Sequence, residues 1–62
     1  MAISASIHKA AKHGNVEQLK AMIAAGTDLT QRNIYGKTPL GVALQYDQKE
    51  AIQVLRRHGA KE

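Results

Sequence analysis

The three histidines are the first candidates for chemistry, because neutral imidazole is the commonest metal ligand in proteins. His8 and His13 are five residues apart. On a helix this spacing does not stack two side chains on one face as a spacing of four residues does. His58 is far away in the sequence, beside an expected helix end where a positively charged ring is favourable. We therefore expect no metal site within the chain.

The acidic residues and the only phosphate-loop-like segment favour structural roles. The five carboxylates lie near expected helix starts, in a loop and at the terminus: Glu17, Asp28, Asp47, Glu50 and Glu62. Residues 36–38 (GKT) are similar to the end of a P-loop, but the upstream glycine and the preceding strand are missing, and Pro39 follows directly. Cys is absent, which excludes thiol nucleophiles and thiolate zinc sites. The sequence thus predicts neither catalytic residues nor a cofactor.

The excess of basic over acidic residues leaves nucleic acid as an alternative partner. Nine Lys and Arg against five Asp and Glu give a net charge of +4, and Arg32 and Lys37 could flank Tyr35 as a base-stacking residue. The basic residues are spread along the chain, however, and aromatic residues make up only 3%. Several cations also fall at expected helix ends, where they complement the helix dipole. A basic nucleic-acid-binding accessory protein therefore remains the second hypothesis.

Length and composition indicate one small domain. The 62 residues include thirteen Leu, Ile and Val, ten Ala, and no Phe or Trp, so the apolar core must be small. No apolar run approaches the ~20 residues that span a bilayer, and the first residues lack the basic region of a signal peptide. We expect a soluble, cytoplasmic protein that is not membrane-bound.

A period of 33 residues divides the chain into two copies of one unit. This offset aligns Gly26 with Gly59, Glu17 with Glu50, and Ala10 with Ala43. It also aligns apolar residues: Ile7 with Leu40, Leu19 with Ile52, and Met22 with Leu55. Such a period is typical of stacked repeat proteins.

The second copy is predicted to contain two helices. Thr38 can cap the first helix, and Pro39 fits the first helical position because its missing N–H costs nothing there. This helix is expected to end near Tyr46. Asp47 then opens the next helix, with Glu50 three residues later as a variant of the capping box.

The first copy has the same order, followed by a loop. A helix is expected over about residues 6–13, and Asn15 can cap the next helix with Gln18 three residues on. Gly26, like its counterpart Gly59, can close its helix in the left-handed conformation. Residues 27–37 lack helical periodicity and carry a glycine at a turn position, which favours an extended, hairpin-like loop.

These units resemble the ankyrin repeat. The segments that carry the resemblance are GKTPL at 36–40, AAKHGNVE at 10–17, AAGTDL at 24–29 and VLRRHGAK at 54–61. The resemblance extends over about residues 4–61. It implies an all-α solenoid with two helix-turn-helix repeats, joined by a β-hairpin-like loop, with repeat one at about 4–32 and repeat two at about 33–62.

Three positions depart from the family pattern. Gly41 replaces a histidine, so the hydrogen bond of that ring should be missing in repeat two, whereas His8 occupies the equivalent place in repeat one. Asp47 replaces the glycine between the helices, which predicts a different turn there. Asn33 replaces an aspartate at the hairpin base, a mild change because Asn also bonds to local backbone.

Polar residues at both ends suggest a complete two-repeat protein. Lys9 and Gln18 lie where the family has apolar residues that face a preceding repeat, and Arg56 lies where an apolar residue would face a following one. The outer faces of terminal repeats need to be polar. Two repeats form a small core, so we expect self-association, as a two-fold dimer.

The resemblance also implies a protein partner, of unidentified kind, bound by the loop tip and the first helix of each repeat. The candidate contact residues are Arg32, Asn33, Ile34, Tyr35, Lys37, Gln45, Tyr46, His8, Lys12 and His13. Tyr35, Tyr46 and Arg32 lead, because Tyr and Arg are enriched at interface hot spots. Two structural alternatives remain: Tyr35 could pack on its own hairpin, and Tyr46 could cover a helix end.

Overall fold

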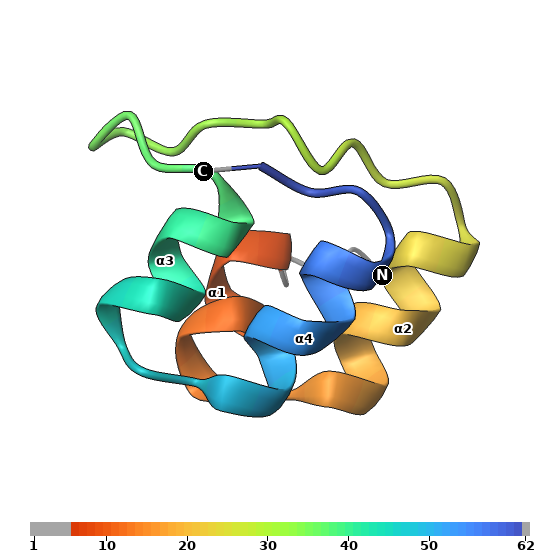
Figure 1. The fold of residues 1–62 in the computed structure, drawn as a ribbon. Coiled ribbons are helices and arrows are strands. Elements are labelled where there is room, and N and C mark those ends of the chain that lie inside the picture. Colours follow the sequence, from red (N-terminus) through yellow and green to blue (C-terminus); the bar gives the residue numbers. More distant parts are fainter. Residues whose placement is uncertain (1–5, 62) are drawn as a thin grey trace, which may run out of the picture.

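Two helical hairpins stack side by side in the computed structural model, which describes residues 6–61. The helices are α1 (Ile7–His13), α2 (Val16–Ala24), α3 (Pro39–Gln45) and α4 (Lys49–Arg57). Figure 1 shows α1 beside α3 and α2 beside α4, with the long loop crossing above them. Residues 6–61 contain no strand, so the predicted all-α fold of two helix-turn-helix units is confirmed. The predicted start of repeat one at residues 4 and 5 and the terminal Glu62 lie outside the described residues.

Side-chain caps begin three of the four helices. Ser6, Asn15 and Thr38 each accept a hydrogen bond from the backbone N–H three residues later, at 3.1, 3.3 and 3.1 Å. Pro39 occupies the first turn of α3, where no N–H is needed. The predicted caps at Asn15 and Thr38 are therefore confirmed.

The predicted capping box at Asp47 is wrong. The residue before α4 is Gln48, which makes no side-chain cap bond, and Asp47 lies in the preceding turn with a positive φ of 53°. In that conformation Asp47 serves the end of α3 instead of the start of α4. Residues that cap a helix N-terminus with their side chains have negative φ and typically an extended backbone, whereas Asp47 has positive φ and lies one residue before the N-cap position.

The prediction of a different turn at Asp47 is also wrong. The N–H groups of Asp47 and Gln48 bond to carbonyls of α3 at 3.1 and 2.9 Å, and those of Gly14 and Asn15 bond to the matching carbonyls of α1 at 3.3 and 2.9 Å. Gly14 also has positive φ, at 67°. Aspartate is one of the few non-glycine residues that adopt this left-handed conformation readily, so it can replace glycine without altering the turn.

Both repeats close in the same way. Gly26 and Gly59 have φ of 89° and 85°, as predicted for left-handed helix ends. The N–H of the next residue, Thr27 or Ala60, bonds back to Met22 or Leu55 at 3.0 and 2.9 Å. The period of 33 residues is thus present in the backbone hydrogen bonds as well as in the sequence.

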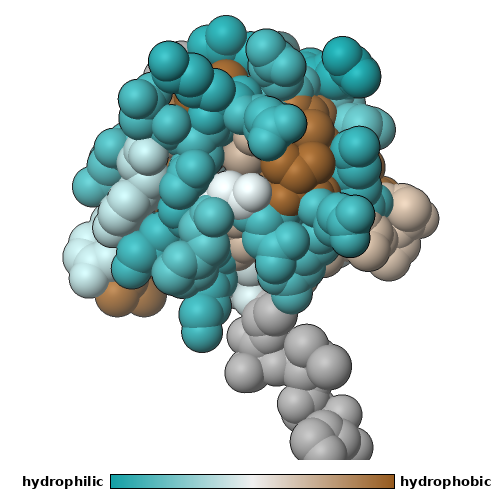
Figure 2. Space-filling model, turned by 90° about the horizontal axis from the view of Figure 1, so that it is seen from below, coloured by the Kyte–Doolittle hydropathy of each residue, from teal (hydrophilic) through white to brown (hydrophobic). Residues whose placement is uncertain are grey.

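The core between the hairpins is built largely from small residues. Five of its ten buried apolar residues are alanines, as this set shows: Ile7, Ala10, Ala11, Leu19, Leu40, Val42, Ala43, Ala51, Leu55 and Ala60. Alanine lets helices approach closely, because interaxial distance depends on the side chains at the contact. Figure 2 shows a mainly hydrophilic face of the molecule, with a larger apolar area right of its centre and smaller ones at the edges.

We predict that Leu55→Ala destabilises the protein by about 2–5 kcal/mol, because it removes a fully buried side chain from a core that has few large ones. The exposed Gln53 on the same helix supplies the control, and Gln53→Ala should change stability by no more than about 0.5 kcal/mol. Urea unfolding followed by circular dichroism measures both values. Equal effects of the two substitutions would contradict this account of the core.

A second prediction concerns the hydrogen bond between Gln48 and the Lys12 carbonyl, which joins the two repeats beside Gly14. Gln48 donates from Nε2 to the Lys12 carbonyl at 2.8 Å, and a Cβ at Gly14 would lie 2.5 Å from Gln48 Oε1. Gly14→Ala should therefore destabilise the protein by about 1 kcal/mol or more, through both backbone strain and displacement of Gln48. In a Gln48→Ala background the cost should be smaller, which a double-mutant cycle in urea detects. An unchanged cost would show that backbone strain accounts for all of it.

Candidate functional site

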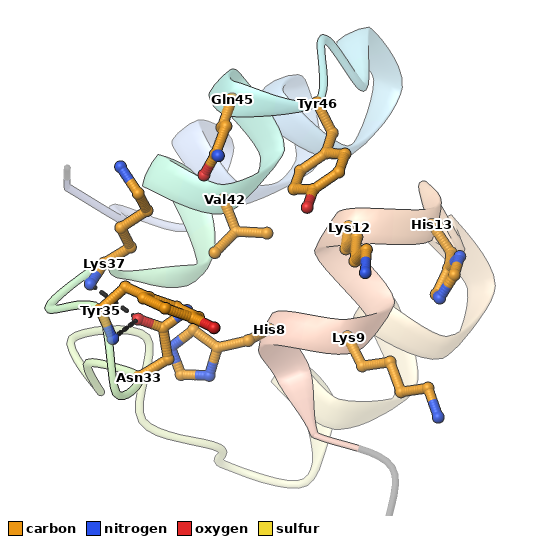
Figure 3. A pocket seen from close by; sticks show the side chains of 10 residues that line it. All are labelled: His8, Lys9, Lys12, His13, Asn33, Tyr35, Lys37, Val42, Gln45 and Tyr46. Atoms are coloured by element: carbon orange, nitrogen blue, oxygen red, sulfur yellow. Dashed lines mark hydrogen bonds between the residues drawn. The ribbon is translucent and has the colours of Figure 1, made fainter.

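A hollow of about 430 Å³ lies between α1, α3 and the tip of the loop. We call it the groove; Figure 3 shows the side chains that line it. These residues come from two helices and the loop: His8, Lys9, Lys12, His13, Asn33, Tyr35, Lys37, Val42, Gln45 and Tyr46. The stacking of the two hairpins therefore creates this surface, since neither repeat contains it alone.

One face of α1 supplies four of the lining residues. His8 and Lys12 are one turn apart, as are Lys9 and His13, so the four side chains lie along the same side of the helix. In Figure 3, His8 extends from α1 toward the loop tip and Lys12 lies near Tyr46, whereas the ends of the Lys9 and His13 side chains extend away from α3 at the rim of the groove. This wall is basic throughout.

The facing wall comes from α3 and is partly apolar. Val42 is buried, and Tyr46 at the end of the helix remains 46% exposed. The ammonium group of Lys12 lies 5.4 Å from the centre of the Tyr46 ring, a cation–π contact of about 0.5–1 kcal/mol at an exposed site. This contact joins the two walls across the repeat boundary.

Asn33 shapes the loop tip through its side chain. Its Oδ1 accepts from the N–H groups of Tyr35 at 2.9 Å and Lys37 at 3.0 Å, and its own N–H donates to the Lys37 carbonyl at 3.0 Å. Gly36, with φ of 76°, completes the tight turn. The expectation that Asn33 makes local backbone bonds is confirmed. The β-hairpin-like form of the whole loop is not confirmed, because the described loop residues contain no strand.

Three further contacts hold the rest of the loop. His8 Nε2 donates to the Gln31 carbonyl at 2.8 Å, which ties the loop to α1. The Thr38 hydroxyl donates to the Lys61 carbonyl at 2.8 Å, which ties the start of α3 to the C-terminal segment. Asp28 accepts from the hydroxyl and N–H of Thr30, and these bonds lower the pKa of the Asp28 carboxyl below its ordinary value.

Eight of the ten candidate contact residues line the groove, and two do not. Arg32 and Ile34 lie outside it on the exposed part of the loop, Ile34 at 90% exposure. Tyr35 is 76% exposed, which does not fit the alternative that it packs on its own hairpin. Tyr46 is the C-terminal cap of α3 and also lines the groove. The alternative that Tyr46 only covers a helix end therefore stays open. The role of all ten residues in binding remains a prediction.

Two lining residues are absent from the sequence-based set. The sequence indicates Lys9 only as a polar residue of an outer face, and it does not distinguish Val42 from other apolar residues. Helical spacing was the available signal, since Lys9 is one turn from His13 and Val42 is one turn from Tyr46. The buried Val42 forms an apolar base for the groove.

Other kinds of site receive no support from the described part of the chain. Within residues 6–61, no group of three His, Asp or Glu comes together as metal ligands. His58 instead donates from Nδ1 to the Val54 carbonyl of its own helix at 2.9 Å. None of the helices in this range has the length and apolar character needed to cross a membrane.

Comparison with known proteins agrees with the geometry. The protein-family model described as "Ankyrin repeats (many copies)" matches residues 7–56 of the chain. The chain belongs to the ankyrin repeat family. This confirms the predicted resemblance, and members of this family are generally protein–protein interaction modules and typically non-catalytic.

The chain also matches a small part of a much larger curated protein. The chain is 36% identical over 52 residues to the potassium channel AKT2/3 of Arabidopsis thaliana. The match covers 84% of this chain but only 6% of the channel. The likeness therefore concerns only a small part of that channel.

We predict that Asn33→Ala loosens the loop tip without unfolding the helices. Loss of Oδ1 removes the acceptor for two N–H groups, so the amides of Tyr35 and Lys37 should exchange faster with solvent. Asn33→Asp keeps an acceptor at the same position and should preserve the slow exchange. Hydrogen exchange measured by NMR compares the two variants. Equal exchange rates in both would show that the Asn33 side-chain oxygen does not hold the loop tip.

Proposed function

We propose that this ankyrin repeat chain is a non-catalytic module that binds a segment of a partner protein in the groove and on the adjoining loop tip. The observation that carries the proposal is the groove itself, lined by side chains from both repeats and from the loop. Pockets that bind ligands typically combine an apolar base with a few polar groups. Val42 and the polar residues around it form this combination.

The hydrogen bonds of the loop support the same proposal. Asn33 holds the turn at the tip, and His8 anchors the preceding residues to α1. Surfaces that are already ordered lose less conformational entropy on binding. The Tyr35 ring is therefore exposed on a short turn that is held by its own hydrogen bonds. An exposed, ordered aromatic ring is expected of an interface anchor.

The boundaries of the two repeats belong to the proposal. We place repeat one at about 4–32 and repeat two at about 33–62, with the change at the loop tip. A cytoplasmic location likewise remains a prediction from the sequence. The ion conduction of the plant channel is not extended to this chain, which spans a small part of that protein.

The double substitution Arg32→Ala and Tyr35→Ala tests the proposed face. Affinity capture and mass spectrometry would first identify a partner, and calorimetry would then measure its affinity for the purified chain. We expect at least about a fivefold loss of affinity, equivalent to about 1 kcal/mol, because truncation of anchor residues commonly costs that much. The circular dichroism spectrum should stay unchanged, since both residues are exposed.

The matched control is the pair Lys49→Ala and Arg57→Ala, both exposed on α4 and outside the groove. This control should leave the affinity nearly unchanged. Loss of helicity in the loop variant would show that Arg32 and Tyr35 are structural. A larger loss of affinity in the control pair would place the binding face on α4.

We also propose that the chain self-associates as a two-fold dimer. The support is the small core, in which half of the buried apolar residues are alanines, and the preference of soluble oligomers for closed two-fold symmetry. Analytical ultracentrifugation at micromolar concentration tests this step. A stable, folded monomer would overturn it without affecting the proposed binding face.

A further inference from the structure

The groove has a single sign of charge. Lys9, Lys12 and Lys37 line it together with His8 and His13. None of the carboxylates among residues 6–61 takes part in the lining. The net charge of +4 is therefore unevenly distributed over the molecule, and this hollow carries much of the excess.

The carboxylates of the described residues have positions elsewhere in the fold. They lie in the first turns of α2 and α4, in the loop and in the α3–α4 turn: Glu17, Glu50, Asp28 and Asp47. Because none of them lines the groove, the lysines there lack a carboxylate within the lining that would reduce their field. Concave surfaces of one charge raise the local concentration of ligands of the opposite charge.

The lysines also occupy both sides of the groove. Lys9 and Lys12 project from α1, and Lys37 lies on the opposite side, where the loop joins α3, as Figure 3 shows. Val42 lies between them on α3, with Tyr35 and Tyr46 on either side of it. A ligand that fits this arrangement carries negative groups along its two edges and an apolar group between them.

We propose that the groove binds an acidic peptide segment of the partner protein. Asp or Glu side chains of the segment pair with Lys9, Lys12 and Lys37, and an apolar side chain packs on Val42. The inference rests on the proposed function, because it names the chemistry of the partner for the same surface. It predicts which partner segments bind: extended segments with acidic residues around an apolar one.

The tyrosines favour a peptide over nucleic acid. Proteins that bind single strands stack successive bases on aromatic rings along a basic channel. One face of the Tyr46 ring already lies under the Lys12 ammonium group, so Tyr35 is the remaining aromatic platform in the groove. The hollow of about 430 Å³ also suits a few side chains.

The test uses a fluorescent peptide in which glutamates flank a central leucine, and the same peptide with glutamine in place of glutamate. Binding is measured by fluorescence anisotropy, and the contact surface by NMR chemical shifts of the whole chain. A single-stranded oligonucleotide is titrated in parallel. The groove variant is Lys9→Gln, Lys12→Gln and Lys37→Gln, and the control variant removes the same charge elsewhere, at Lys20, Lys49 and Arg57.

We expect the glutamate peptide to shift amide signals of α1, α3 and the loop tip. The groove variant should weaken its binding by about tenfold, as loss of three exposed ion pairs implies. The control variant should bind nearly as the original chain does, and the glutamine peptide should bind weakly to all three. Circular dichroism verifies that both variants keep their helices.

Three results would overturn the inference in different ways. Equal weakening in the groove and control variants would show that net charge alone attracts the peptide. Binding of the oligonucleotide at the groove, with a steep loss of affinity between about 50 and 200 mM salt, would favour the nucleic-acid alternative. If an identified partner binds the groove but the lysine substitutions have no effect, the acidic chemistry is wrong while the interaction function stands.

Discussion

The packing of α1 against α3 determines where the rest of the molecule lies. The two helices are in contact, and their residues Ala10, Ala11 and Ala43 are almost fully buried; such small side chains permit a close approach of packed helices. This contact sets the second hairpin beside the first and extends to α2 and α4. It also aligns one face of α1 with one face of α3, which creates the groove.

Several polar contacts reinforce the alignment of the two repeats. Gln48 of the second hairpin bonds to the last turn of α1, Lys12 lies over the Tyr46 ring, and His8 holds the loop at Gln31. Each of these contacts is modest by itself. The first two contacts join repeat one to repeat two, and the third fixes the loop within repeat one, so they support an apolar core of limited size.

The groove illustrates how function arises from relative position in a repeat protein. Its basic residues come from separate parts of the chain, and the acidic residues among 6–61 lie in the loop, at a turn and at helix starts, outside its lining. In the sequence the basic residues are spread along the chain, and several of them fall at expected helix ends. Folding brings three lysines and two histidines to one hollow, and the uneven charge becomes visible only there.

The local structure was readable from the sequence because it depends on near neighbours. Thr38 and Pro39, Asn15 with Gln18, and the glycines 33 residues apart specified the helix boundaries and the repeat, since caps and turns involve residues a few positions away. Asp47 was misread because two local roles, a helix cap and a left-handed turn, are both open to aspartate. Which of these two roles Asp47 takes depends on where α3 ends in the folded chain.

The amino-acid sequence by itself determined the helices, the period of 33 residues and membership of the ankyrin repeat family. Only the tertiary structure decided that Arg32 and Ile34 lie outside the groove, that Lys9 and Val42 line it, and that its charge has one sign. The physical reason is distance along the chain. Hydrogen bonds within a turn follow from residue type, whereas contacts between α1, α3 and the loop depend on how closely two separate hairpins pack.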